Sequence, residues 1–289
     1  MNPRRIMTIL LLTVLLVLLA RWRVGRLFYY PDHVSYGTPA DVGLKYEEVT
    51  FPSRDGTRLT GWFVPAVGPA HGTVIHFHGN AQNMSAHFGF VNWLPAAGFN
   101  LFVFDYRGYG KSAGRPDRRG LYEDSLAALD YIRTRKDLDR DRLVVLGQSL
   151  GGAQAIAAVG GGNRSGVKGV AIESTFFSYR EIVRDKIGDI PLLSLLKTPL
   201  ARLLMDDDLS PANAVGKIAP IPLLLVYGTS DPIIPYDHGT RLFALAREPK
   251  QFWTIDGGEH TEAFIETGSP HRLRLVAFFR ETVGTRKGN

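Results

Sequence analysis

From residue 47 onward, the hydrophobic residues fall into short apolar runs separated by longer segments with helical spacing. Six of these runs are apolar throughout, which is typical of strands in a parallel sheet covered by helices on both faces. The alternation of strands and helices predicts an α/β fold with a mostly parallel, doubly wound sheet. The six predicted strands are Thr73–Phe77, Leu101–Asp105, Leu143–Leu146, Val167–Ile172, Pro222–Tyr227 and Phe252–Ile255.

Two further segments, Glu47–Phe51 and Arg58–Val64, are predicted to form an antiparallel pair joined by the turn Ser53-Arg54-Asp55-Gly56. Residues 31–45 before them are rich in turn-forming residues and are predicted to be a linker. Helices are expected between or after the strands at Gly120–Arg133, Ser149–Ala158, Asp237–Ala246 and His271–Val283.

The N-terminal segment differs from the rest of the chain because Ile6 to Ala20 is almost entirely apolar. As a helix this run would be about 22 Å long, and the residues up to Tyr30 could extend it if the arginines among them snorkel. We predict that residues 1–26 are an N-terminal hydrophobic helix that anchors a 27–289 domain to a membrane with a single pass. A cleaved signal segment of a secreted or periplasmic protein and a buried core helix are the alternatives. The run ends directly at Arg21 without a good small-residue cleavage site, which favours the anchor.

The composition of the chain excludes several classes of function. Five arginines before Asp32 carry most of the net charge of +6, so the remaining chain is nearly neutral and nucleic-acid binding is not expected. The chain has no cysteine, which excludes disulfides, thiolate catalysis and cysteine-ligated zinc. The sequence implies no cofactor, and a chain of 289 residues suits one α/β domain.

One motif indicates a nucleophile. The strand Leu143–Leu146 leads into Gly147-Gln148-Ser149-Leu150-Gly151, and a helix rich in small residues follows. G-x-S-x-G between a strand and a helix is the pattern of a serine held on a sharp turn, where only small neighbours fit. We therefore predict Ser149 as a catalytic nucleophile.

A serine nucleophile needs a base and an acid that orients the base. Asp231 and His260 each follow a predicted strand, in the chain order that this arrangement requires after Ser149. We predict that His260 is the base and Asp231 the orienting acid. Glu173, which also follows a strand, is the rival acid, and Asp231 could instead be a simple turn residue. The other histidines at 71, 87, 238 and 271 are expected at the surface.

Two backbone N–H groups are expected to stabilise the oxyanion. One belongs to Leu150, and the other lies in the loop His78-Gly79-Asn80-Ala81, where Asn80 is favoured over Ala81. His76 and His78 could be read as metal ligands, but no carboxylate cluster accompanies them, so no metal site is predicted.

These residues resemble the α/β-hydrolase superfamily over about residues 27 to 285. More narrowly, the chain is similar to membrane-anchored serine hydrolases grouped with serine aminopeptidase-like and acyl-protein-thioesterase-like members. In that family the segment Asp105–Ser112 is a structural signature beside the site, and we expect its charges to pair locally. The motifs that carry the resemblance are His78-Gly-Asn-Ala81, Asp105-Tyr-Arg-Gly-Tyr-Gly-Lys-Ser112, Gly147-Gln-Ser-Leu-Gly151, Gly228-Thr-Ser-Asp231 and Glu259-His260.

Residues 176–219 lie between two predicted strands and are too many for a simple connection. We predict a small helical lid whose apolar face lines an acyl pocket or touches the bilayer, although ordinary packing on the sheet is an alternative. The predicted function is a serine hydrolase for acyl esters or thioesters, with a small-molecule or lipid-like acyl substrate. A serine peptidase or amidase with the same triad and a non-catalytic, membrane-tethered module are the alternatives.

Overall fold

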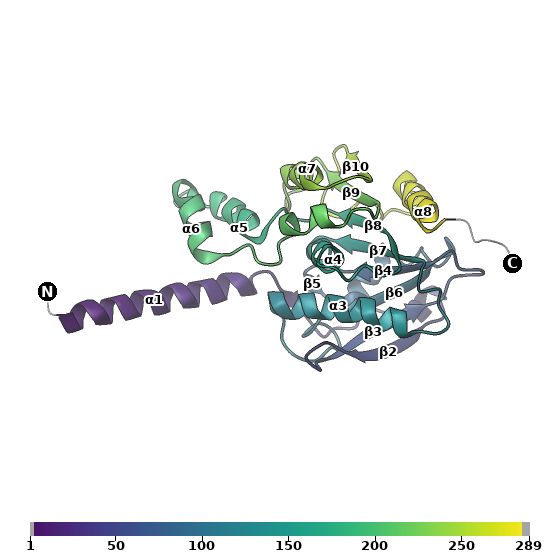
Figure 1. Ribbon diagram of the computed structural model, residues 1–289, viewed down its shortest axis with the longest axis horizontal. Coiled ribbons are helices and arrows are strands. Elements are labelled where there is room, and N and C mark those ends of the chain that lie inside the picture. The colour runs from purple at the N-terminus through teal and green to yellow at the C-terminus, as the bar shows by residue number, and fades with distance from the viewer. Residues whose placement is uncertain (1–2, 285–289) are drawn as a thin grey trace.

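The computed structural model describes residues 3–284, and its centre is an eight-stranded sheet (Figure 1). The strand order is β10-β9-β8-β7-β4-β6-β3-β2, and only the pairings of β3 with β2 and with β6 are antiparallel. The predicted mostly parallel sheet with one antiparallel hairpin is therefore confirmed. The strands are β2 (Glu47–Pro52), β3 (Arg58–Val64), β4 (Thr73–Phe77), β6 (Asn100–Asp105), β7 (Leu143–Gln148), β8 (Val167–Glu173), β9 (Leu223–Gly228) and β10 (Lys250–Ile255).

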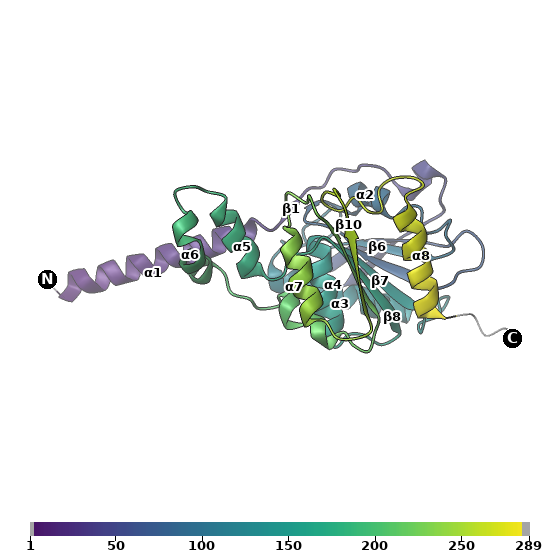
Figure 2. The same cartoon turned by 90° about the horizontal axis from the view of Figure 1, so that it is seen from above.

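Helices cover both faces of the sheet, and each face has its own buried core (Figure 2). Along β4, Ile75 belongs to the core under α3, α4 and α7, whereas the adjacent Val74 belongs to the core under α8. Alternate side chains thus enter two cores, which explains why the strands are apolar throughout. The helices of these layers are α2 (Met84–His87), α3 (Arg118–Thr134), α4 (Leu150–Gly160), α7 (Tyr236–Leu245) and α8 (Pro270–Val283).

The predicted linker is bound to the domain surface. It begins at the second residue of β1 (Tyr30–Pro31), which pairs in parallel with β5 (Ala81–Gln82) in the loop after β4. Farther along, the Asn83 side-chain amide donates to the carbonyl oxygen of Val34 at 2.8 Å. A two-residue strand is too short to leave a periodic pattern, so the sequence did not predict this pair.

The helix α1 (Pro3–Arg26) projects from the domain toward the N-terminus (Figure 1). It has 24 residues, an 18-residue stretch of it has a mean hydropathy of 2.0, and by length and composition it could cross a membrane. At its C-terminal end, Arg21 Nη2 lies 3.0 Å from Asp206 Oδ2, and Arg21 Nη1 donates to the carbonyl oxygen of Leu203. These contacts join α1 to the end of α6 (Lys197–Leu204) and to the segment after it.

Residues 176–219, which we call the insertion, are largely helical as predicted and project beside α1. Between its two longer helices lies a tip, residues 189–196, in which Leu192 and Leu195 are 93% and 94% exposed. The insertion contains α5 (Tyr179–Gly188), η3 (Ser194–Leu196), α6 (Lys197–Leu204), η4 (Pro211–Asn213) and η5 (Val215–Lys217).

The charges of the Asp105–Ser112 segment do not pair locally, so that prediction is wrong. Arg107 forms a buried ion pair with Asp124 on α3, at 2.8 Å, and reaches Asp55 in the β2–β3 turn at the same distance. Asp105 instead accepts a hydrogen bond from the backbone N–H of Met84 at 2.7 Å. The segment is thus held by residues distant in sequence, which local spacing could not indicate.

Candidate active site

Ser149 lies on the turn between β7 and α4, at the carboxyl edge of the sheet. Its backbone has φ 53° and ψ −122°, a conformation that L-residues rarely adopt. The Ser149 N–H donates to the Glu173 carbonyl oxygen at 2.9 Å, which fixes the turn against β8. A Cβ on Gly151 would lie 2.0 Å from the Phe77 carbonyl oxygen, so this position of the motif must be glycine.

Asp231 and His260, which follow β9 and β10, are brought together. His260 Nδ1 lies 2.7 Å from Asp231 Oδ2. The other carboxylate oxygen, Oδ1, accepts hydrogen bonds from the backbone N–H groups of Ile233 and Ile234 at 2.8 and 2.9 Å. Burial alone would raise the pKa of Asp231, but the hydrogen bonds from His260 and these N–H groups hold that pKa below its usual value. Asp231 is therefore an ionised hydrogen-bond acceptor for the imidazole.

Ser149 and His260 face one cavity of about 500 Å³, whose walls are otherwise mostly apolar. Leu150 and Asn80 also line it, whereas Ala81 belongs to β5 and is not among the described lining residues. An added Cβ on Gly79 would lie 3.8 Å from the Ser149 Cβ, so the loop after β4 passes directly beside the serine. The geometry therefore favours Asn80 over Ala81 as the partner of Leu150.

Both carboxylate oxygens of Glu173, the rival acid, accept hydrogen bonds from groups other than His260. Its Oε2 accepts a hydrogen bond from the Gln148 side chain at 2.6 Å, and its Oε1 accepts one from the Ala263 backbone N–H at 2.8 Å. The second bond fixes the loop that carries His260. Burial raises the pKa of Glu173 from 4.5 to about 7, although these hydrogen bonds act in the opposite direction.

The Glu173→Gln variant should become more stable than the parent protein as the pH rises. The folded parent retains the Glu173 proton to a higher pH than the unfolded chain, so its unfolding free energy falls between pH 4.5 and about 7. A glutamine can accept and donate in the same network without this cost. The advantage of the variant should grow by on the order of 2 kcal/mol across that window, measured by denaturant unfolding near both limits. Identical pH dependence in parent and variant would contradict the assigned shift.

Of the four histidines predicted at the surface, one is buried and the other three are partly exposed. His238 on α7 is 1% exposed; its Nδ1 accepts from the Phe177 N–H and its Nε2 lies 2.8 Å from Asp185 Oδ2. His87 is only partly exposed and its ring stacks on His78.

The His76 and His78 pair is not part of a metal-binding cluster in the described residues. His76 Nε2 contacts the Gln148 side-chain oxygen at 2.8 Å. Among the described residues, no group of three or more His, Cys, Asp or Glu could hold a metal ion.

Part of the cavity wall could not be predicted from the sequence. Val24 near the end of α1, and Leu27 and Phe28 in the turn after it, line the cavity, although the sequence offered them only as an extension of the anchor. The insertion supplies much of the remaining wall. Its lining residues are Phe176, Ile182, Val183, Lys186, Ile187, Ile190 and Leu204.

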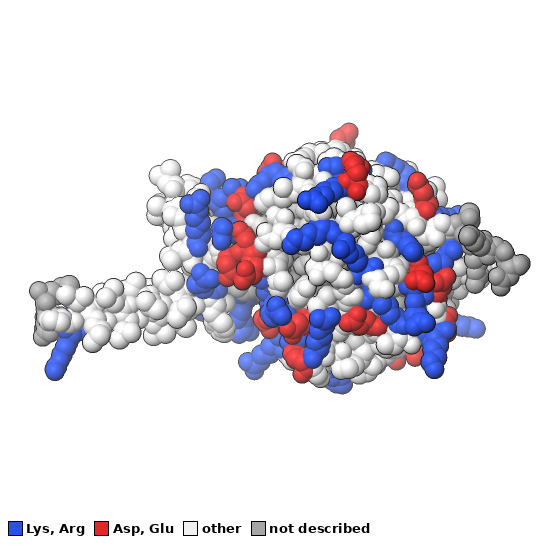
Figure 3. All heavy atoms as spheres, in the orientation of Figure 1, with Lys and Arg blue, Asp and Glu red and all other residues white. Residues whose placement is uncertain are grey.

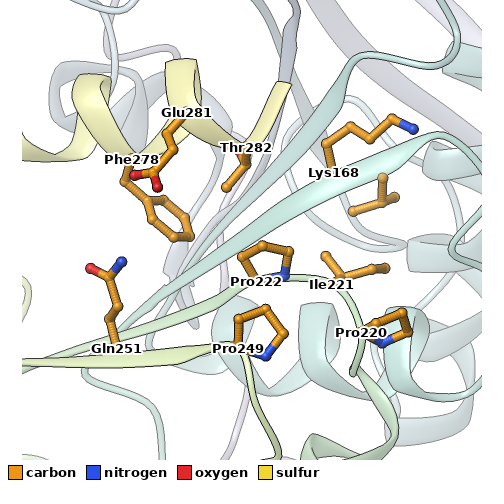
Figure 4. Close-up of a pocket in the computed structure, with 10 residues that line it drawn as sticks. Lys168, Pro220, Ile221, Pro222, Pro249, Gln251, Phe278, Glu281 and Thr282 are labelled. Carbon is orange, nitrogen blue, oxygen red and sulfur yellow. The ribbon is translucent and has the colours of Figure 1, made fainter. Parts of the chain in front are cut away.

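A second cavity, of about 450 Å³, lies at the opposite edge of the sheet (Figure 4). Pro222 and Pro249 line it just before β9 and β10, and Phe278 and Thr282 of α8 complete it. In open α/β sheets, ligands bind beyond the carboxyl ends of the strands, which is where the Ser149 cavity lies. The Ser149 cavity is therefore the candidate active site.

A model of the serine aminopeptidase S33 family matches residues 68–213, half of the 289-residue chain. This chain belongs to that family of hydrolases. The protein YfhR of Escherichia coli O157:H7 is 44% identical over 87% of this chain and 85% of its own length. The α/β-hydrolase domain-containing protein WAV2 of Arabidopsis thaliana is 34% identical over 84% of this chain and 82% of its own length.

Solved structures show the same fold. An esterase from Pyrococcus furiosus superposes with a TM-score of 0.72 and 21% identity, covering 89% of this chain and 98% of the esterase. Acetyl xylan esterase 1 from Thermoanaerobacterium superposes with a TM-score of 0.64 and 18% identity, covering 92% and 93%. The predicted α/β-hydrolase fold is confirmed, and the protein is an enzyme of the hydrolase class.

Proposed function

We propose that this hydrolase cleaves acyl esters or thioesters through an acyl-enzyme on Ser149. The observation that carries the proposal is that the His260–Asp231 pair and Ser149 meet at one apolar cavity, beside Leu150 and Asn80. A base held by an ionised acid, a serine on a strained turn and two N–H donors are the parts that acyl transfer requires.

In the proposed reaction, His260 Nε2 accepts the proton of the Ser149 hydroxyl as its oxygen attacks the acyl carbonyl carbon. The N–H groups of Leu150 and Asn80 stabilise the oxyanion that forms. The imidazolium then protonates the leaving alcohol or thiol, and the acyl group remains on Ser149. Water, deprotonated by His260, attacks this ester, and the carboxylic acid and the free serine are released.

The cavity favours acyl esters or thioesters over the peptides that an exopeptidase would cleave. An exopeptidase that holds a substrate ammonium group needs a carboxylate near its nucleophile. None of the described residues that line the Ser149 cavity is acidic, and Lys186 is the one Lys or Arg among them. The apolar walls, supplied by Ile182, Ile187 and similar side chains, are suited to an acyl chain.

We further propose that α1 is an uncleaved membrane anchor and that the insertion is a lid. The helix continues without interruption past Ala20 to Arg26, and its Arg21 is bound to Asp206. A helix that continues past the end of the apolar run and contacts the domain is suited to an anchor that stays part of the folded protein. The insertion lines the cavity that contains Ser149 and His260, as a lid would.

A fluorophosphonate probe tests the proposal. The full-length protein in detergent should be labelled, because His260 activates Ser149, and Ser149→Ala should lose all labelling. Ser125→Ala is the matched control, since Ser125 is a buried serine on α3 whose hydroxyl bonds only the Leu121 carbonyl oxygen. A folded parent that resists the probe would refute the serine mechanism and favour the non-catalytic module.

A further inference from the structure

The end of α1 and the turn after it line the cavity and contact the insertion. The Phe28 ring packs edge-on against Phe176 and Tyr179, with centroid distances of 6.0 and 5.0 Å. Together with Val24 and Leu27, Phe28 lines the cavity that contains Ser149. The apolar helix and the acyl cavity are therefore continuous.

The insertion also follows α1 away from the domain. Val17, Ala20, Arg21 and Val24 are partly covered, whereas all other described residues of α1 except Gly25 are exposed. Their spacing places them on one face of the helix, and α6 contacts α1. Both ribbon views show α5 and α6 beside α1, on the side of the domain from which α1 projects (Figures 1 and 2). A membrane that contains the apolar run up to Ala20 would therefore meet the insertion.

The tip of the insertion is unusually apolar for a surface in water. Leu192 and Leu195 are almost fully exposed, and other apolar side chains accompany them within residues 189–196. Contiguous exposed apolar surface of this kind marks an interaction site. Basic residues flank the tip, including the exposed Lys197 and Arg202, and Asp189 at its start is paired with Lys186 at 3.8 Å. Blue side chains gather beside α1 in Figure 3, with red ones next to them. Leucines rimmed by cations are suited to the interface of an anionic membrane.

We propose that the tip of the insertion enters the same membrane leaflet as α1 and that the substrate is a membrane lipid with a fatty acyl ester. The acyl chain passes from the bilayer along α1 into the cavity at Phe28 and Ile187, and its carbonyl reaches Ser149. This inference rests on the proposed serine hydrolase function. Contact with a second copy of the chain explains the exposed leucines of the tip less well, because an α1 that crosses the membrane already places the tip beside the bilayer.

Insertion of the tip can be measured independently of catalysis. The chain has no cysteine, so a single introduced cysteine can be labelled alone with an environment-sensitive fluorophore. Leu195→Cys in full-length protein should shift to shorter emission wavelength on transfer from detergent to vesicles of phosphatidylglycerol and phosphatidylethanolamine, and nitroxide lipids should quench it. The matched control is Leu273→Cys on α8, which is 74% exposed and lies on the far side of the domain. An unshifted, unquenched label at 195, or a shift that disappears when protein is diluted in the vesicles, would overturn the proposal.

The substrate is tested with the double variant Leu192→Ser/Leu195→Ser in the same vesicles. Release of fatty acid from vesicle lipid should fall at least about tenfold, since two apolar side chains lose their burial in the membrane. Hydrolysis of soluble p-nitrophenyl butyrate should stay within about twofold of the parent, and Leu273→Ser should change neither activity.

Activity on vesicle lipid and activity on the soluble ester distinguish failure of this inference from failure of the proposed function. Probe labelling and butyrate hydrolysis without release of fatty acid from vesicles would overturn the lipid substrate and leave the serine hydrolase standing. Failure of both labelling and butyrate hydrolysis would refute the proposed function, and the assigned substrate with it.

Discussion

An Asp231→Asn variant is expected to fold normally and to hydrolyse acyl esters about 10,000-fold more slowly than the parent. Oδ1 of Asp231 accepts two backbone N–H groups, so the asparagine must keep its oxygen there. Its amide NH₂ then takes the place of Oδ2, 2.7 Å from His260 Nδ1. Two donors cannot face each other, so Nδ1 must become the acceptor and the ring proton must move to Nε2. In that tautomer His260 cannot accept the proton of Ser149.

The measurement is kcat with a soluble ester, with unfolding followed in parallel. Asp185→Asn is a matched control, because Asp185 bonds His238 at 2.8 Å in a similar way but is not among the residues that line the cavity. This control should keep most of the activity. Nearly full activity of Asp231→Asn, with loss of activity in Glu173→Gln, would instead identify Glu173 as the acid that orients the base.

The second large effect is expected on stability, at the Arg107–Asp124 ion pair. Asp124 is fully buried and accepts hydrogen bonds from the Arg107 backbone and guanidinium, while Arg107 is 7% exposed. Asp124→Ala would leave a buried guanidinium without its main counterion, and should lower the free energy of unfolding by about 3–5 kcal/mol. Denaturant unfolding of the full chain in detergent measures this loss.

Glu123→Ala is the adjacent control. Glu123 lies 3.9 Å from the same guanidinium but is more exposed, so its removal should cost less than about 1 kcal/mol. Because replacing both charges removes the desolvation penalty as well, Arg107→Leu/Asp124→Leu should recover part of the stability lost in Asp124→Ala. Equal losses in Asp124→Ala and Glu123→Ala would show that burial does not govern this pair.

The positions of the inner parallel strands could be predicted because side chains of each strand enter two cores, so that these strands are almost entirely apolar. The ends of the strands were harder, since backbone pairing continues after hydrophobicity stops. Gln148 pairs with Glu173 in the sheet, so both polar residues belong to strands that the pattern ended earlier. The candidate residues Ser149, Asp231 and His260 were accessible to sequence reasoning because each follows an apolar strand.

Contacts between residues distant in sequence could not be predicted in this way. No local pattern links Arg107 to Asp124, or Phe28 to the cavity wall, because both depend on how elements pack. His238 did carry a signal that was missed. It lies four residues before the buried Leu242, on the inward face of α7, so helical periodicity alone indicated that it is buried.

Because one part of the cavity wall is Val24 of α1 and the turn directly after this helix, the order of that part depends on helix cooperativity. A cut before Arg21 would leave six helical residues ahead of Leu27, fewer than two turns. Helices that short do not persist in water without tertiary support, since the first turn fixes several residues for each hydrogen bond formed. The contacts of Arg21 and Phe28 alone would then have to offset the conformational entropy lost when this segment becomes ordered. In the intact chain, the hydrogen bonds of the long N-terminal helix contribute to ordering this part of the cavity wall.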